Sequence, residues 1–439
     1  MTKSTSIYDL DGKPELKVAI PLGLQHVLAM FAGNIAPIMI IAGVVGLSIE
    51  DKVFMIQCAM FVAGLVTLIQ LYPVGRVGAR LPIVMGTSFA FVPTAIAVGE
   101  SYGLPAVLGG SLIGSLAEII MGFFVKPLRK YFPPIVTGIV LVTIGFSLFP
   151  VGINYFAGGA GAADFGSPKN LFLGFFVLII IILLQRFSKG LLNVASILIG
   201  IILGYIVAIP LKKVDFSGVS TAGWISIPRP LKFGMEFRLD AILKFASVYL
   251  VVGLETLGNV SGITLSGLNR EANEDEMSGA VIADGVGSAI GAFFNVLPNT
   301  AFGQNAGIVA MTKVMSRYCV ATGAIFLMLA GIVPKFGAIC AAMPSSVLGG
   351  AVMMVFSMIT ISGFKMISLA GFDDRNTIIL AISLSLGLGF AQVPAATEYM
   401  PVVMKSFFGD SVVAAGLLAL FLNAIIPQKE ETEEETQAE

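Results

Sequence analysis

The feature that most constrains this chain is a series of apolar runs, each long enough to cross a membrane. A transmembrane helix needs about 20 mostly apolar residues. Only 12% of the residues are charged, which is about half the share found in soluble domains. The sequence therefore predicts an all-α polytopic membrane protein, with spans at about residues 17–43, 53–72, 104–125, 132–152, 171–185, 191–210, 241–262, 278–296, 318–333, 345–361, 376–393 and 406–427.

Two shorter segments, at about residues 83–98 and 301–312, raise the expected number of spans to fourteen. Polar groups and irregular backbone are tolerated at membrane depth only where protein buries them or they line a cavity. We therefore expect a broken span, extended from about 297 to 302 and helical from about 303. The free amide groups at the start of such a half-helix suit a ligand rich in carbonyl oxygens. The alternative is a re-entrant segment that only packs. The interrupting residues are Pro298, Asn299, Thr300, Gln304 and Asn305.

The two short segments resemble each other. Gly86–Phe91 and Asn299–Gln304 both place a threonine two residues before a phenylalanine and a small residue directly after it. Interrupted spans at corresponding places in two halves are typical of transporters, which bind their substrate between the repeats. Because seven is odd, two halves of seven spans each would have inverted topology.

Positive charges predict the orientation in the membrane. With the N-terminus inside, the inner loops and tails hold sixteen basic residues and the outer loops nine, five of them in the long 211–240 loop. Cytoplasmic loops are enriched in basic residues, so we expect both termini to be cytoplasmic, in a bacterial-type plasma membrane. Residues 428–439 are predicted to be a solvated acidic tail. The inner group is Lys3, Lys13, Lys17, Arg76, Arg80, Lys126, Arg129, Lys130, Arg186, Lys189, Arg270, Lys313, Arg317, Lys365, Arg375 and Lys429.

Composition argues against several classes of function. A net charge of −1 argues against a nucleic-acid partner. The cysteines Cys58, Cys319 and Cys340 stand singly among apolar residues, so neither a metal site nor a disulfide follows from them. The sequence displays no nucleophile–base pair, and we predict no catalytic residue, metal or cofactor. A transporter is favoured over an enzyme.

The ionisable side chains inside predicted spans include His26, Glu118, Glu255 and Asp284. A charged side chain at that depth costs on the order of 2.5–3.5 kcal/mol, so each is a functional hypothesis. The structural alternatives are a packed histidine, a Glu255 that pairs only with His26, and an Asp284 that only supports the fold. Glu118 receives no role. Titratable groups at this depth favour coupling to protons, although carboxylates also bind sodium.

The segment Gln304–Lys313 contains a motif in which Gln304 is followed by Asn305, any residue, Gly307, four further residues and Thr312. This motif resembles the signature of the nucleobase–ascorbate transporter family, also called the nucleobase:cation symporter-2 family, and in particular its xanthine and urate permeases. The resemblance covers about residues 17–427. Further residues agree with the family pattern in order and spacing: Gln25, His26, Gly86, Thr87, Ser88, Phe89, Glu255 and Asp284.

The resemblance implies fourteen spans in a seven-plus-seven inverted repeat. Spans three and ten would each be a short strand followed by a half-helix. Spans one to four and eight to eleven would form a core domain, the others a gate domain, and homodimers would be usual. The implied boundaries are an N-terminal tail at 1–16, core segments at 17–125 and 241–334, gate segments at 126–240 and 335–427, and the tail at 428–439.

The resemblance also assigns roles to residues. Glu255 would accept N–H groups of a nucleobase. Gln304, with one carbonyl acceptor and two amide donors, would read the edge of a purine. The rings of Phe89 and Phe302 would stack on the base, and backbone amides around Ala90 and Gly303 would reach its carbonyls. Proton coupling or support of the site would fall to Glu255, Asp284, His26, Asn305 and Thr312.

Glutamine at position 304 points to xanthine or urate, whereas relatives with glutamate at this place resemble uracil carriers. Several xanthine-selective relatives carry a polar residue where this chain has Ala90, so the sequence does not favour xanthine over urate as the substrate. We expect an importer of an oxidised purine, coupled to proton symport by alternating access. The alternatives are a uracil or pyrimidine permease of the same family and an anion exchanger or channel of the same architecture.

Overall fold

A computed structural model describes residues 5–125 and 133–427 of the chain. The predicted acidic tail at 428–439 lies outside the described residues. So do five of the basic residues used to predict the orientation, namely Lys3, Lys126, Arg129, Lys130 and Lys429.

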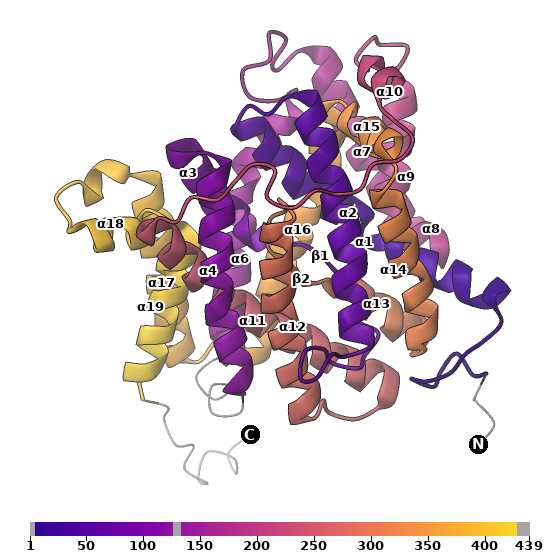
Figure 1. Cartoon of the computed structure of the whole chain (residues 1–439). Helices are drawn as coiled ribbons and strands as arrows, with labels where there is room; N and C mark the ends of the chain where they lie inside the picture. Colours follow the sequence, from indigo (N-terminus) through magenta and orange to yellow (C-terminus); the bar gives the residue numbers. More distant parts are fainter. Residues whose placement is uncertain (1–4, 126–132, 428–439) are drawn as a thin grey trace.

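Helices occupy the predicted segments in order, and the two interrupted segments each contain a short strand followed by a helix (Figure 1). Within residues 5–125 and 133–427, seven helices are long and apolar enough to cross a membrane, or eight if the bent pair α14–α15 counts as one span. The predicted all-α membrane fold is confirmed. The elements that match the fourteen segments are α1 (Leu16–Val44), α2 (Ile49–Leu71), β1 (Met85–Thr87) with η1 (Phe89–Phe91) and α3 (Val92–Tyr102), α4 (Leu104–Phe123), α6 (Pro134–Phe156), α7 (Pro168–Phe187), α8 (Leu191–Val194) with α9 (Ser196–Ala208), α11 (Leu239–Leu268), α12 (Glu274–Phe293), β2 (Asn299–Ala301) with α13 (Gly303–Thr312), α14 (Arg317–Gly331), α16 (Ser345–Ala370), α17 (Asp374–Gln392) and α19 (Ser411–Ile425).

Four shorter elements lie between these: α10 (Ser217–Thr221), α15 (Pro334–Ala341), η3 (Pro394–Thr397) and α18 (Val402–Phe408). Helix α15 follows α14 at a bend of 84°.

Local sequence fixes where the helices begin. At the start of α12, the side chain of Asn273 accepts a hydrogen bond from the Glu276 amide at 2.8 Å, and the Glu276 carboxylate accepts one from the Asn273 amide at 2.9 Å. This reciprocal capping satisfies two amide groups that a helix start leaves free. Arg270 binds the same carboxylate at 2.8 Å, so the polar turn before α12 has a fixed geometry.

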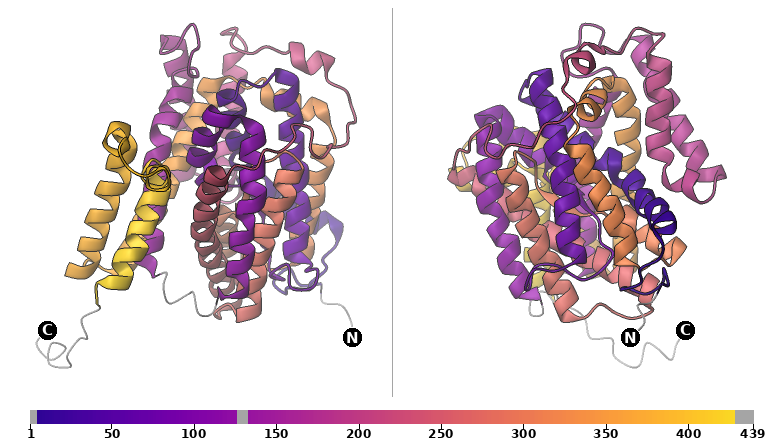
Figure 2. Two further views of the ribbon diagram at one scale, coloured as in Figure 1. Left: turned by 60° about the vertical axis from the view of Figure 1, so that its left-hand side comes forward. Right: turned by 45° about the vertical axis from the view of Figure 1, so that its right-hand side comes forward.

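The helices pack in two groups (Figure 2). In one group, α1 and α2 pack against α14, and α4 packs against α11 and α12. In the other, α16 packs against α6 and α7, and α19 packs against α6 and α17. The segment before α1 and the end of α19 lie on the same side of the molecule (Figure 1). The first group contains both strands.

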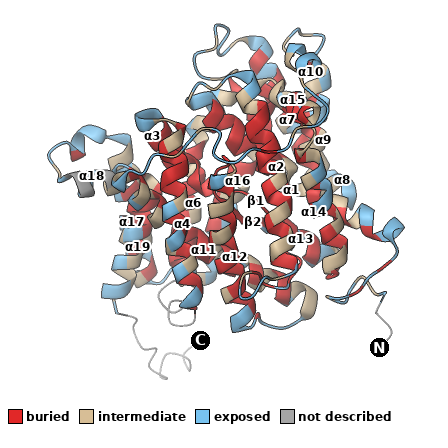
Figure 3. Ribbon diagram, in the orientation of Figure 1, coloured by how far each residue is buried: buried red, intermediate tan, exposed pale blue. Residues whose placement is uncertain are grey.

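Strands β1 and β2 meet in the centre of the molecule, inside the zone of buried residues (Figure 3). They pair antiparallel, with Met85 opposite Ala301, Gly86 opposite Thr300 and Thr87 opposite Asn299. Each strand leads directly into its half-helix. The paired strands therefore bring the starts of α3 and α13 together, as an inverted repeat requires.

Candidate functional site

The β1–β2 pair is held in place from behind by polar side chains. The Oδ1 atom of Asn34 on α1 accepts hydrogen bonds from the Thr87 amide at 2.8 Å and the Thr87 hydroxyl at 3.0 Å. On the other side, the Ser288 hydroxyl of α12 donates to the Asn299 carbonyl at 3.1 Å and accepts from the Asn299 amide at 2.9 Å. Both side chains are buried, so each strand is tied to a neighbouring helix in a region without competing water.

The ring of Phe302 is enclosed between α1 and β1. A Cβ atom on Gly33 would lie 2.6 Å from Cε1 of this ring, and one on Gly86 would lie 2.7 Å from Cε2. Only glycine leaves room for the ring at these two places. Phe89 lies in an edge-to-face contact with Phe356 of α16, with ring centroids 5.3 Å apart. Phe302 and Phe89 line a small recess beside the strands.

Helix α13 begins at this recess. Gly303 and Gln304 form its first turn, where amide groups have no acceptor within the helix. The Asn259 amide on α11 donates to the Ala301 carbonyl at 2.8 Å, and a Cβ atom on Gly303 would lie 3.0 Å from Asn259 Oδ1. The positive end of α13 therefore faces the recess, with Asn259 beside it.

A cavity of about 1170 Å³ reaches the start of α13 from one side, and the recess of about 50 Å³, which touches both strands, adjoins it. Glu255, Gly303 and Gln304 line both. The other group of helices supplies an apolar wall through Leu141 and Ile359. The cavity extends to Pro134 at the start of α6.

The structure thus brings together the six residues predicted to bind substrate. Glu255, Gln304, Gly303, Phe89, Ala90 and Phe302 all line the recess. The Ala90 amide already donates to the Ser88 hydroxyl, at 3.3 Å.

Apart from Glu255, the residues predicted to support the site or move protons lie behind the recess, not on it. Asp284 Oδ2 accepts hydrogen bonds from the hydroxyls of Thr256 and Thr300, the latter at 3.3 Å. His26 is buried, and the side-chain amide of Asn305 lies 3.0 Å from its Nδ1 and donates to its carbonyl at 3.1 Å. His26 therefore holds the first turn of α13 in place.

Thr312 lies at the far end of α13. Its hydroxyl donates to the Ile308 carbonyl at 2.8 Å, and it accepts from the Val314 amide at 3.3 Å. These bonds close the last turn of the helix, so Thr312 acts on the site only through the position of α13.

Sequence reasoning did not single out Asn34, Ser288, Thr256 or Asn259 as parts of the site. Each is a polar residue inside a predicted span. That placement is a signal in principle, because a polar side chain at membrane depth needs a partner. The partners themselves lie on remote segments and could not be read from the chain.

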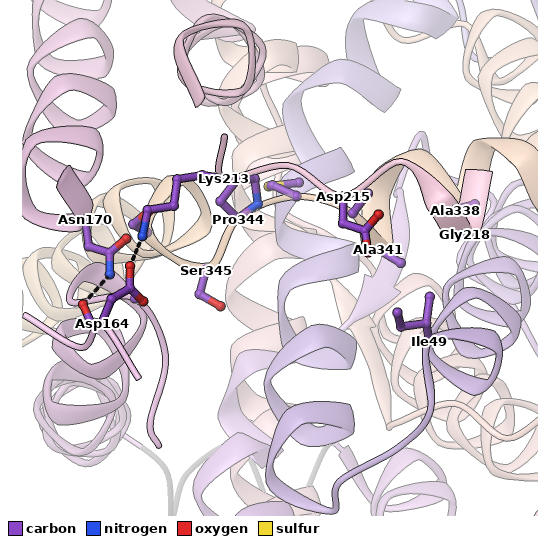
Figure 4. Close-up of a pocket in the computed structure, with 14 residues that line it drawn as sticks. Ile49, Asp164, Asn170, Lys213, Asp215, Gly218, Ala338, Ala341, Pro344 and Ser345 are labelled. Atoms are coloured by element: carbon purple, nitrogen blue, oxygen red, sulfur yellow. Dashed lines mark hydrogen bonds and ion pairs between the residues drawn. The ribbon is translucent and has the colours of Figure 1, made fainter. Parts of the chain in front are cut away.

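A separate cavity of about 310 Å³ lies at the start of α16, beside Pro344 and Ser345 (Figure 4). Lys213 and Asp164 form an ion pair on its wall, and Asn170 donates to the Asp164 carbonyl at 2.9 Å. None of the predicted substrate-binding residues lines it.

Two short strands that join opposed half-helices beside a central cavity define a class of membrane transporter. The transmembrane domain of a cyanobacterium bicarbonate transporter, BicA, has the same fold, with a TM-score of 0.59 and 14% identity over 92% of this chain and 97% of that one. At this identity the likeness shows the fold alone.

Sequence comparisons identify the family. Residues 17–396 match the family model described as Permease family. The chain is 37% identical over 409 residues to the xanthine permease of Bacillus subtilis (strain 168), covering 92% of this chain and 93% of that protein. It is 37% identical over 414 residues to the uric acid permease PucK of the same organism, covering 93% and 95%. The chain belongs to the nucleobase–ascorbate transporter family, and it is a multi-pass membrane transporter rather than an enzyme.

Proposed function

We propose that this chain imports an oxidised purine base, xanthine or urate, together with protons across the plasma membrane. One observation carries the proposal: Glu255 and Gln304 line the same recess, at the first turn of α13. Relatives named xanthine permease and uric acid permease, which match more than nine-tenths of this chain, support the substrate class.

The recess offers the groups that an oxidised purine needs. Xanthine and urate carry ring N–H groups next to carbonyl oxygens. The Glu255 carboxylate can accept from N–H groups, in a charge-assisted bond that is about twice as strong as a neutral one. Gln304 can both donate and accept, and the first amides of α13 can donate to carbonyl oxygens. Phe89 presents an aromatic side chain to the same recess.

Transport would proceed by movement of one group of helices against the other. The core segments, 17–125 and 241–334, carry both strands, both half-helices and Glu255. The gate segments, 126–240 and 335–427, contribute the apolar wall at Leu141 and Ile359. The wide cavity runs from the recess toward the start of α6 and opens in that direction, so a relative shift would open the recess to the other side while the site stays in the core. We propose that the open side is cytoplasmic, together with both termini.

Glu255 would couple substrate to protons. An unpaired charge in low-dielectric surroundings is costly, so the core would move when Glu255 carries a proton or is compensated by substrate N–H groups. Asp284, His26, Asn305 and Thr312 would support this geometry. The family resemblance further leads us to propose a homodimer, and sodium is the alternative coupling ion.

The rival functions fit the recess less well. Bicarbonate is carried by the transporter that shares the fold, but a carboxylate at position 255 would repel an anion at the start of α13. A pyrimidine carrier of the same family is disfavoured by glutamine, rather than glutamate, at position 304.

Competition uptake tests the function. Cells or vesicles that contain the protein should take up labelled xanthine or urate, and each purine should compete with the other far better than uracil does. Gln304→Glu should sharply reduce uptake, because it removes the amide donors and adds a charge. Gln185 lines the wider cavity away from the recess, so Gln185→Glu is the matched control and should keep uptake. Preferred competition by uracil, or native uptake by a well-expressed Gln304→Glu protein, would refute the assignment.

A further inference from the structure

One buried acid has no part in the site described so far. Glu118 lies on α4, is fully buried, and both of its carboxylate oxygens lack a hydrogen-bond donor among the described residues. A charge left in this state costs several kcal/mol. The chain keeps an ionisable group where an apolar side chain would pack at less cost, so Glu118 requires a chemical explanation.

Glu118 faces Asp284 of α12, the helix that packs against α4. The two carboxyl groups lie within hydrogen-bonding reach of each other. Asp284 Oδ2 is occupied by the hydroxyls of Thr256 and Thr300, whereas Asp284 Oδ1 has no donor. Two ionised carboxylates have no hydrogen to share, so a bond between them exists only if one of them is protonated.

The surroundings of the pair decide which acid carries the proton. Asp284 accepts two hydroxyl hydrogen bonds, and such bonds stabilise an ionised carboxylate. Glu118 has none, and its Oε1 lies against the backbone of α11, where a Cβ atom on Gly253 would approach it to 3.4 Å. No described basic side chain forms an ion pair with either acid.

Two further titratable groups face the pair, both from α11. Glu255 directly precedes Thr256, whose hydroxyl donates to Asp284. The Tyr249 hydroxyl is buried and shares a hydrogen bond of 2.9 Å with Ser111 of α4. Two buried carboxyl groups this close cannot both be ionised.

We propose that Glu118 is permanently protonated and donates a hydrogen bond from its carboxyl group to Oδ1 of Asp284. Asp284 is then the ionised member of the pair, held by three donors: Glu118, Thr256 and Thr300. Because Thr300 belongs to β2, this network ties α4 and α12 to the floor of the substrate recess. Glu118 is a positioning residue that acts through Asp284, and it holds a proton distinct from the one that Glu255 would exchange.

The first test is uptake, which rests on the proposed purine transport. Glu118→Gln keeps a donor, the side-chain amide, and should transport within about three-fold of the native rate. Glu118→Leu leaves Asp284 without its third donor and should lose about ten-fold or more, as expected for a hydrogen bond to a charged group. If Gln fails as completely as Leu while both proteins are folded, Glu118 needs its own charge and the proposal is wrong.

The second test is infrared spectroscopy of the purified protein without substrate, so its result does not depend on the transported compound. In a Glu255→Gln background, which removes that carboxyl group, one buried protonated carboxylic acid should be visible at neutral pH. The infrared band of this acid should disappear when Glu118→Gln is added. Glu100 is an exposed acid on α3, so the band should remain when Glu100→Gln is added instead. Persistence of the band in the Glu118→Gln double variant would overturn the proposal. Absence of the band in Glu255→Gln protein would also overturn the proposal. Loss of the band on adding sodium chloride, but not choline chloride, would overturn it too, because that result would indicate a sodium site.

Discussion

The enclosure of Phe302 predicts that one added methyl group on α1 weakens substrate binding. A Cβ atom on Gly33 would lie 2.6 Å from Cε1 of the ring, and ordinary contact begins at 3.4 Å. The ring would have to move by at least 3.4 − 2.6 = 0.8 Å. It cannot retreat freely, because Gly86 and Met30 enclose its other side. The strain must therefore be relieved by displacing β2 and the first turn of α13.

The size of the effect follows from two opposing terms. Overpacking a buried site costs about 1–3 kcal/mol. Alanine in place of a helical glycine returns about 0.5–1 kcal/mol. The net cost of Gly33→Ala to the native arrangement of β2 and α13 should be about 1–2 kcal/mol. Substrate binding needs that arrangement, so this cost corresponds to an increase of about 5–30-fold in the dissociation constant for xanthine or urate.

Equilibrium binding of labelled xanthine to detergent-solubilised protein measures this cost. Gly389→Ala is the matched control, since a Cβ atom there meets nothing within 4 Å, and it should bind normally. In a Phe302→Leu background, which lacks the clashing ring atom, Gly33→Ala should add little further loss. Additive losses in this double-mutant cycle would refute the steric explanation, and so would native binding by Gly33→Ala.

Two further substitutions test the walls of the recess and the movement of the helix groups. Ala90→Asn should narrow the substrate range toward xanthine by adding a polar group and removing space; an unchanged ratio of xanthine to urate uptake would mean that this wall does not touch the base. Thr94 on α3 donates a hydrogen bond of 2.5 Å to Asp410, which caps α19, so Thr94→Val removes a bond between the two helix groups in the conformation with the open cavity. Maleimide labelling of a cysteine placed at Thr137, on the cavity wall, should then become several-fold slower, and an unchanged rate would show that the bond does not favour this conformation.

Local sequence was sufficient to locate the broken spans. Polar residues and a proline between apolar runs predicted an extended segment to about 302 and a helix from about 303, and the structure has β2 at Asn299–Ala301 and α13 from Gly303. The second broken span was likewise expected near 83–98, where β1, η1 and α3 occupy residues 85–102. Apolar length and its interruption are properties of neighbouring residues, so they can be read directly.

Contacts between remote residues could not be read in this way. Asn34 meets Thr87 across 53 positions of the chain, and no periodic pattern links them. The ring of Phe302 was expected to stack on a base, but its edges are enclosed by Gly33 and Gly86, so a direct role toward substrate stays a prediction. One structural alternative paired Glu255 only with His26, whereas the side-chain partner of His26 is Asn305. Such pairings depend on how helices cross, which tertiary packing decides.

The measurement that tests proton-coupled purine import most directly is accumulation in reconstituted vesicles with an imposed inward proton gradient. The native protein should concentrate labelled xanthine or urate and carry protons inward with it. Glu255→Gln should bind substrate more weakly and lose both accumulation and proton flux, because its amide can neither release a proton nor accept substrate N–H groups as strongly. Glu255→Asp should keep part of the activity. Accumulation by Glu255→Gln at the native level and with the native pH profile would contradict the role of this carboxyl group and move the proton to Asp284 or His26.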